Sequence, residues 1–125
     1  MKPQRLGRLS LRLDALYCLV LGSVVALTAP ATVSAVPLPL PLIVAVGAAV
    51  VVWAGLVEWM RAKLPQPLAL RIVLTANIAA TVLVAALAVA AVPVLAALVI
   101  LTVAVDIALF AGSQAVALTR LRTAA

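Results

Sequence analysis

Residues 72–105 read IVLTANIAATVLVAALAVAAVPVLAALVILTVAV, and no ionised side chain interrupts them. With their flanks, from Leu68 to Leu118, they are long enough for two helices that cross a bilayer, since one crossing takes about 20 apolar residues. Pro93 lies midway; it fixes φ and has no N–H to donate, which predicts a turn there. The stretch therefore predicts an antiparallel hairpin of two transmembrane helices, over 68–91 and 94–118.

A second uncharged run, from Ala15 to Val57, predicts another hairpin of the same kind. Its first helix is expected over 13–33 and its second over 42–60. Between these helices, residues 36–42 read VPLPLPL, and the alternating prolines exclude a helix interior. We expect an extended connection there.

Residues 1–125 are thus predicted to form a single transmembrane domain, an all-α antiparallel bundle of four membrane helices. Hydrophobic residues make up 68% of the chain, against roughly 45–50% in average soluble domains. Within the second helix, Gly47 and Gly55 share a face with Val51, which predicts a close helix contact. The lipid bilayer is the first expected partner, and another membrane subunit, either a second copy or a different chain, is the second.

The basic residues predict the orientation of the helices. They fall before the first span, between the second and third, and after the fourth: Lys2, Arg5, Arg8, Arg12, Arg61, Lys63, Arg71, Arg120 and Arg122. The connections at 34–41 and 91–93 carry no charge. By the positive-inside rule both termini are expected in the cytoplasm, with the chain in the plasma (inner) membrane.

The net charge of +6 has this topogenic origin, and we expect no nucleic-acid partner because the basic residues form no polar face with interleaved aromatic residues.

An alternative interpretation makes the first span a cleaved secretory signal. A basic start, an apolar stretch and the small residues Val33-Ser34-Ala35 follow one another in the order that such a signal requires. The apolar part is about 20 residues long, however, whereas a signal sequence has about 7–15. Cleavage would leave three spans and an outside N-terminus, and we expect the uncleaved chain.

Asp106 is the most informative polar residue, because its expected depth is roughly 18 Å from the inner end of its span, near the bilayer midplane. Thr102 and Ser113 share its helical face. Asn77, roughly 13 Å from the same side, shares a face with Thr81 and is expected within reach of Asp106. Two interpretations stay open: an interhelical hydrogen bond that fixes the packing, or a protonatable site that moves a proton or couples it to a solute.

A second group of charged residues is expected at the cytoplasmic edge of the membrane: Asp14, Glu58, Arg12, Arg61 and Arg71. One interpretation is a set of interfacial ion pairs, each worth at most about 1 kcal/mol. The other is a site for an anion or a lipid headgroup. The sequence does not decide between them.

The sequence has no histidine and a single cysteine, Cys18. It also lacks a nucleophile beside a base and a glycine-rich phosphate loop. We therefore expect no enzyme, no cofactor and no metal. The leading hypothesis is a non-catalytic accessory or assembly component of the cell membrane. The alternatives are a small oligomeric proton-coupled transporter or channel that uses the carboxyl group of Asp106, and a lipid-interacting protein that uses the cytoplasmic arginines.

The stretch Leu11-Arg12-Leu13-Asp14-Ala15, with Gly22 and with Asn77 after the basic loop, resembles a pattern in uncharacterised small four-span integral membrane proteins of high-GC actinobacteria. The resemblance covers much of the chain; it implies a four-helix membrane bundle and no particular activity, and it draws attention to Asp14 and Asn77.

Small multidrug transporters also have four short spans and an acidic residue in the first. Here Asp14 is expected at the membrane edge beside Arg12, so that likeness is one of architecture only.

Overall fold

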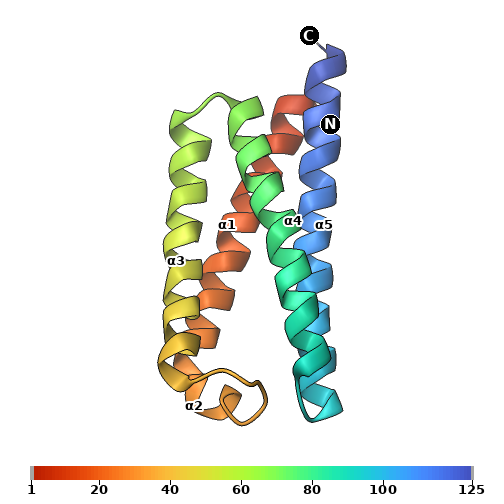
Figure 1. Ribbon diagram of the computed structural model, residues 1–125. Coiled ribbons are helices and arrows are strands. Elements are labelled where there is room, and N and C mark those ends of the chain that lie inside the picture. Colours follow the sequence, from red (N-terminus) through yellow and green to blue (C-terminus); the bar gives the residue numbers. More distant parts are fainter. Residues whose placement is uncertain (1, 125) are drawn as a thin grey trace.

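The computed structural model describes residues 2–124, which form four long helices and one short one (Figure 1). The long helices are α1 (Pro3–Leu27), α3 (Leu40–Lys63), α4 (Gln66–Ala90) and α5 (Val94–Ala124), and the single-turn helix α2 (Ala29–Thr32) follows α1. Residues 2–124 contain no strand. All four long helices are long and apolar enough to cross a membrane. The prediction of an all-helical chain with four such helices is confirmed.

Each expected span corresponds to one helix, but α1 begins at Pro3 and not at Leu13. Proline suits the first position of a helix, and arginine is a good helix former, so the basic segment continues the apolar helix outward. The helix ends at Leu27, earlier than expected, where the chain turns into α2. Asp14 therefore lies eleven residues into its helix, roughly 16 Å from the start and not at the edge.

The long helices form two hairpins, and the contacts of α1 join them. Helix α1 packs along α3, α4 packs along α5, and α1 also contacts α5 and α4. Helices α3 and α4 diverge from the loop that connects them (Figure 1). The start of α1, the end of α5 and the α3–α4 loop lie at one end of the bundle, and α2 lies at the other. The second hairpin is thus held to the first chiefly through α1.

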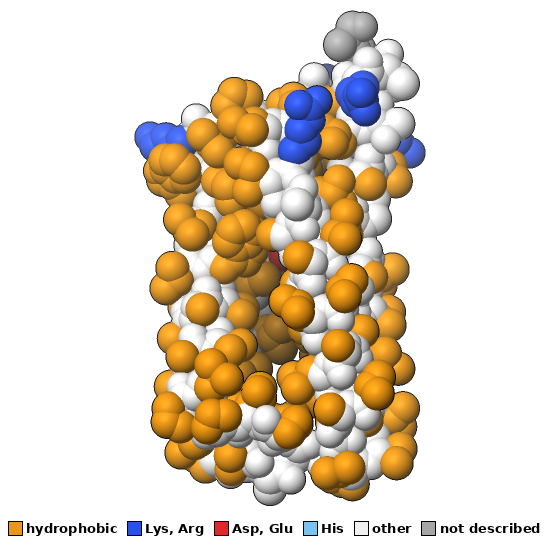
Figure 2. Space-filling model, viewed as in Figure 1, with side chains coloured by type: hydrophobic (Ala, Val, Ile, Leu, Met, Phe, Trp, Pro, Cys, Tyr) orange, Lys and Arg blue, Asp and Glu red, His pale blue; other side chains and the backbone are white. Residues whose placement is uncertain are grey.

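Large apolar side chains are exposed on all four long helices, and the exposed charged side chains lie toward the end where α1 begins. Figure 2 shows lysine and arginine side chains gathered there, and hydrophobic side chains over the rest of this face. The same view shows a hollow between α3 and α4. We call the end with the lysines and arginines the basic end.

Buried apolar side chains form two clusters, one toward each end. The larger, toward the basic end, comprises Leu11, Ala15, Val57, Met60, Ala69, Leu70, Val73 and Ala117. The smaller, at the opposite end, comprises Ala29, Val36, Ile43 and Ala91. Near it the N–H of Val92 donates to the carbonyl of Ala35 at 2.9 Å, which links the two connections at that end.

Helices α1 and α3 are in close contact at Gly22 and Gly47. A Cβ atom on Gly22 would lie 2.6 Å from the carbonyl oxygen of Gly47, and one on Gly47 would lie 2.7 Å from the backbone nitrogen of Ala26. Such distances leave no room for a methyl group, so both positions require glycine for this contact. The predicted contact at Gly47 is confirmed. The prediction was wrong for Gly55, which has open space around it.

These two glycines of α3 provide a matched pair of substitutions. We expect Gly47→Ala to lower the free energy of unfolding by about 1–3 kcal/mol, because the new methyl group pushes α1 away. Gly55→Ala is expected to be neutral or slightly stabilising, since alanine is the better helix former. Unfolding of the purified protein in a mild detergent measures both. Equal effects of the two substitutions would contradict the packing described.

Candidate functional site

Three polar side chains from three helices meet inside the bundle. Asp14 of α1, Asn77 of α4 and Gln114 of α5 are 1%, 4% and 0% exposed. The Nδ2 atom of Asn77 donates to Oδ2 of Asp14 at 2.6 Å and to Oε1 of Gln114 at 2.9 Å. The Nε2 atom of Gln114 donates to the same Oδ2 of Asp14 at 2.7 Å. The three side chains thus form a closed ring of hydrogen bonds, which we call the buried triad.

The members of the buried triad meet because they lie at equal depth. Asp14 follows the start of α1 by eleven residues, Asn77 follows the start of α4 by eleven, and Gln114 precedes the end of α5 by ten. Each is therefore roughly 15–16 Å from the basic end. Apolar residues one turn away on the same faces are also buried, among them Leu11 and Val73. The triad is a polar layer within an apolar interior.

The carboxyl group of Asp14 accepts hydrogen bonds on both of its oxygens. Besides the two amide groups, the thiol of Cys18 donates weakly to Oδ1 of Asp14, at 3.4 Å. Among the described residues, no buried side-chain nitrogen or oxygen lacks a partner. Burial of a carboxyl group is costly unless such bonds compensate it. The triad therefore ties α1 to the α4–α5 hairpin.

The predicted hydrogen bond between Asn77 and Asp106 is not formed. Asn77 belongs to the buried triad, whereas Oδ2 of Asp106 accepts a hydrogen bond from the hydroxyl of Tyr17 at 2.9 Å. The prediction placed the inner end of the fourth span at Leu118, but α5 continues to Ala124. Asp106 thus lies roughly 27 Å from the basic end of its helix, and Asn77 roughly 16 Å from that of α4. The two residues are at different depths.

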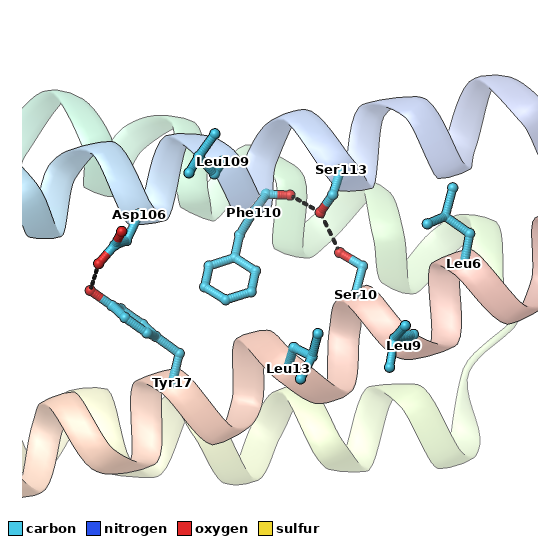
Figure 3. Close-up of a pocket in the computed structure, with 9 residues that line it drawn as sticks. All are labelled: Leu6, Leu9, Ser10, Leu13, Tyr17, Asp106, Leu109, Phe110 and Ser113. Atoms are coloured by element: carbon cyan, nitrogen blue, oxygen red, sulfur yellow. Dashed lines mark hydrogen bonds between the residues drawn. The ribbon is translucent and has the colours of Figure 1, made fainter.

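Asp106 and Tyr17 lie in a groove between α1 and α5, the α1–α5 groove, with a volume of about 420 Å³ (Figure 3). Oγ of Ser10 and Oγ of Ser113 share a second hydrogen bond across it, at 2.6 Å. The ring of Phe110 lies between the two polar pairs (Figure 3), with its centroid 5.4 Å from that of Tyr17 and an interplanar angle of 56°. The groove is lined by Leu6, Leu9, Ser10, Leu13, Tyr17, Asp106, Leu109, Phe110 and Ser113. The α1–α5 groove is mainly apolar and has a carboxyl group near one end.

Of the other residues in the predicted midplane group, Ser113 lines the groove, and the two threonines belong to neither the groove nor the buried triad. Ser113 lines the groove together with Asp106, in agreement with their predicted common face. The hydroxyl groups of Thr81 and Thr102 donate to carbonyl oxygens one turn back in their own helices, at 2.7 and 2.9 Å. This is the common arrangement of threonine in apolar helices. The predicted polar group is therefore two separate groups.

The predicted charged group at the edge is also divided. Nε and Nη2 of Arg61 donate to Oε2 of Glu58 at 2.9 and 2.7 Å, and within residues 2–124 this is the one ion pair found. Asp14 does not take part, since it is buried in the triad. Arg12 and Arg71 are exposed. Among the described residues, no three histidine, cysteine or acidic side chains gather as they would to hold a metal ion.

The sequence interpretation missed Ser10 and Tyr17 as parts of a site, although a signal was present. Leu6, Ser10, Leu13 and Tyr17 follow one another at spacings of three and four, which puts them on one face of a helix. That face exists only if the helix begins before Leu13. The extension of α1 to Pro3 is thus what brings Ser10 and Tyr17 into one groove.

The two hydrogen bonds that Asn77 donates make a measurable contribution to stability. We expect Asn77→Ala to lower the free energy of unfolding in detergent by about 1–3 kcal/mol, because Oδ2 of Asp14 and Oε1 of Gln114 each lose a buried donor. Thr75→Ala on the same helix is the control: Thr75 is exposed and donates to the carbonyl of Arg71. Equal stabilities of the two variants would show that the triad contributes nothing.

Comparison of the chain with protein-family models, with curated proteins and with solved structures finds no match. The resemblance expected from the LRLDA stretch, Gly22 and Asn77 therefore stays a prediction. The residues that suggested it have defined places in the fold. Asp14 and Asn77 are hydrogen-bonded to each other, and Gly22 lies at a close contact between α1 and α3.

Proposed function

We propose that this chain is an integral component of the plasma membrane, crossing it four times with both termini in the cytoplasm. Four helices of sufficient length and hydropathy support the crossings, as does the outer surface, on which large apolar side chains are exposed on every long helix. The basic end supports the orientation, because lysine and arginine are retained on the cytoplasmic side.

This topology can be tested by labelling single cysteines in intact cells. In a Cys18→Ala background, Ser34→Cys lies in the connection opposite the basic end, and Lys63→Cys lies at the end of α3. An impermeant maleimide is expected to label Ser34→Cys in intact cells, and Lys63→Cys only after permeabilisation. The reverse pattern, or labelling of both in intact cells, would exclude the proposed orientation.

Within the membrane, we propose a non-catalytic role as an accessory or assembly component. The observation that carries this proposal is the closed buried triad, whose polar groups serve to hold helices together. The surface has two positions where a helix of a partner protein could pack closely. Gly55 and Gly112 are exposed, and nothing lies within 4 Å of a Cβ atom built at either position. Small residues on outward faces of membrane helices allow a neighbouring helix to come close.

The assembly role can be tested by native mass measurement of the chain purified in mild detergent. We expect a defined complex, either of several copies or with another membrane protein, and Asp106→Asn is expected to leave it intact. Gly55→Leu and Gly112→Leu, which fill the open positions, are expected to reduce it. A chain that stays monomeric at all concentrations, without any partner, would contradict the proposal.

The second candidate is a small proton-coupled transporter or channel, and the α1–α5 groove favours it. The groove holds Asp106, which is partly exposed and whose carboxyl group accepts its one hydrogen bond from Tyr17. Proteoliposomes distinguish the two candidates. An accessory component is expected to give wild-type and Asp106→Asn vesicles the same rate of proton leak, whereas a faster leak in wild-type vesicles alone would establish the second candidate.

A further inference from the structure

The carboxyl group of Asp106 accepts fewer hydrogen bonds than the other two acidic side chains of the chain. Asp14 accepts two amide hydrogen bonds and one from a thiol, and Glu58 is paired with the guanidinium group of Arg61. Asp106 accepts one hydrogen bond, on Oδ2, from the neutral hydroxyl of Tyr17. A carboxylate among apolar side chains is costly without a counter-charge. Among the described residues, the carboxyl group of Asp106 thus has no counter-charge.

The chain itself does not supply this cation. The deepest of its lysines and arginines, Arg12, is nine residues into α1, roughly 13 Å from the basic end, whereas Asp106 is roughly 27 Å from that end. The ion pair found within residues 2–124 joins Arg61 to Glu58. A positive charge beside Asp106 would have to come from a ligand.

The surroundings of Asp106 select the kind of cation. Tyr17 meets the carboxyl group through its hydroxyl, and the ring of Phe110 lies next along the groove (Figure 3); ring faces attract ammonium groups. A divalent metal ion needs six or more oxygen ligands or a near-ideal octahedron, and one carboxyl group with one hydroxyl is too few. Leucine side chains line the rest of the groove, which suits an apolar body. Its volume of about 420 Å³ lies within the range of small-molecule sites.

We propose that the α1–α5 groove binds an organic ammonium ion that carries an apolar body. The ammonium group lies against Asp106 and the rings of Tyr17 and Phe110, and the apolar body lies along the leucines toward Ser10 and Ser113. The proposal goes beyond the assembly role and does not depend on it, because binding is measured on the purified chain whether or not it associates or transports.

The test is calorimetric titration of the purified protein in a neutral detergent. The probe is octyltrimethylammonium, and octanoate, with a chain of the same length and the opposite charge, is the control ligand. We expect saturable binding of the cation, at one site per chain, and no saturable binding of octanoate. Because both ligands also enter micelles, each titration is compared with one of the detergent alone. Equal binding of octanoate would overturn the proposal and leave an apolar groove without charge selectivity.

Variants locate the site. Asp106→Asn is expected to weaken binding of the probe about tenfold or more, through loss of a charge–charge interaction in a medium of low dielectric constant. Glu58→Gln removes a carboxyl group outside the groove and is expected to bind as the wild type does. Unchanged affinity of the Asp106→Asn protein would overturn the proposal.

Two further variants keep the test decisive if Asp106→Asn does not fold. Phe110→Leu retains an apolar wall but removes a ring face, and we expect about two- to fivefold weaker binding. Leu109→Trp places a large side chain at the rim, where Leu109 is 67% exposed, and is expected to block the groove. Wild-type affinity in both folded variants would contradict binding in this groove.

Discussion

The arrangement of this bundle depends on the buried triad, because a polar side chain inside an apolar bundle has only the neighbouring helices as partners. Asp14, Asn77 and Gln114 come from three helices and satisfy one another at 2.6–2.9 Å. Rotating any one helix by a single residue would turn its side chain away by about 100° and break two of the three hydrogen bonds. Apolar contacts tolerate such shifts far better. The triad thus selects one register of α1 against α4 and α5.

The remaining contacts follow from that choice. Gly22 and Gly47 fix the distance between α1 and α3, and the triad fixes α1 against the second hairpin. With Asp14 turned inward, the face of α1 that bears Tyr17 is turned toward α5 and Asp106. The buried triad therefore positions the two helices that form the α1–α5 groove. A ligand bound there would contact both of these helices.

The sequence was sufficient to predict four apolar helices, the turns near Pro93 and the proline-rich connection, and the placement of basic residues at one end. It was also sufficient for the contact at Gly47. It misplaced Asp14, because the first span was started after the last arginine of the basic segment. Hydropathy marks the part of a helix suited to lipid, whereas the helix itself continues as long as its backbone groups can bond.

Misplaced helix ends also caused the sequence analysis to assign Asp14 and Asn77 to different groups. Measured from the actual helix ends, Asp14, Asn77 and Gln114 have equal depths, while Asp106 is deeper. Depth alone still would not pair side chains, because pairing also needs the rotation of each helix about its axis. That rotation is set by contacts between residues far apart in the sequence, such as the bond between Asp14 and Gln114.

A double-mutant cycle tests the central role of the triad most directly. Asn77→Leu, Gln114→Leu and the double variant are unfolded under identical conditions in detergent, and the three losses in unfolding free energy are compared. Since the two side chains bond each other and share Oδ2 of Asp14, we predict a coupling of about 0.5–3 kcal/mol. Additive losses, with no coupling beyond experimental error, would contradict a triad that acts as one unit.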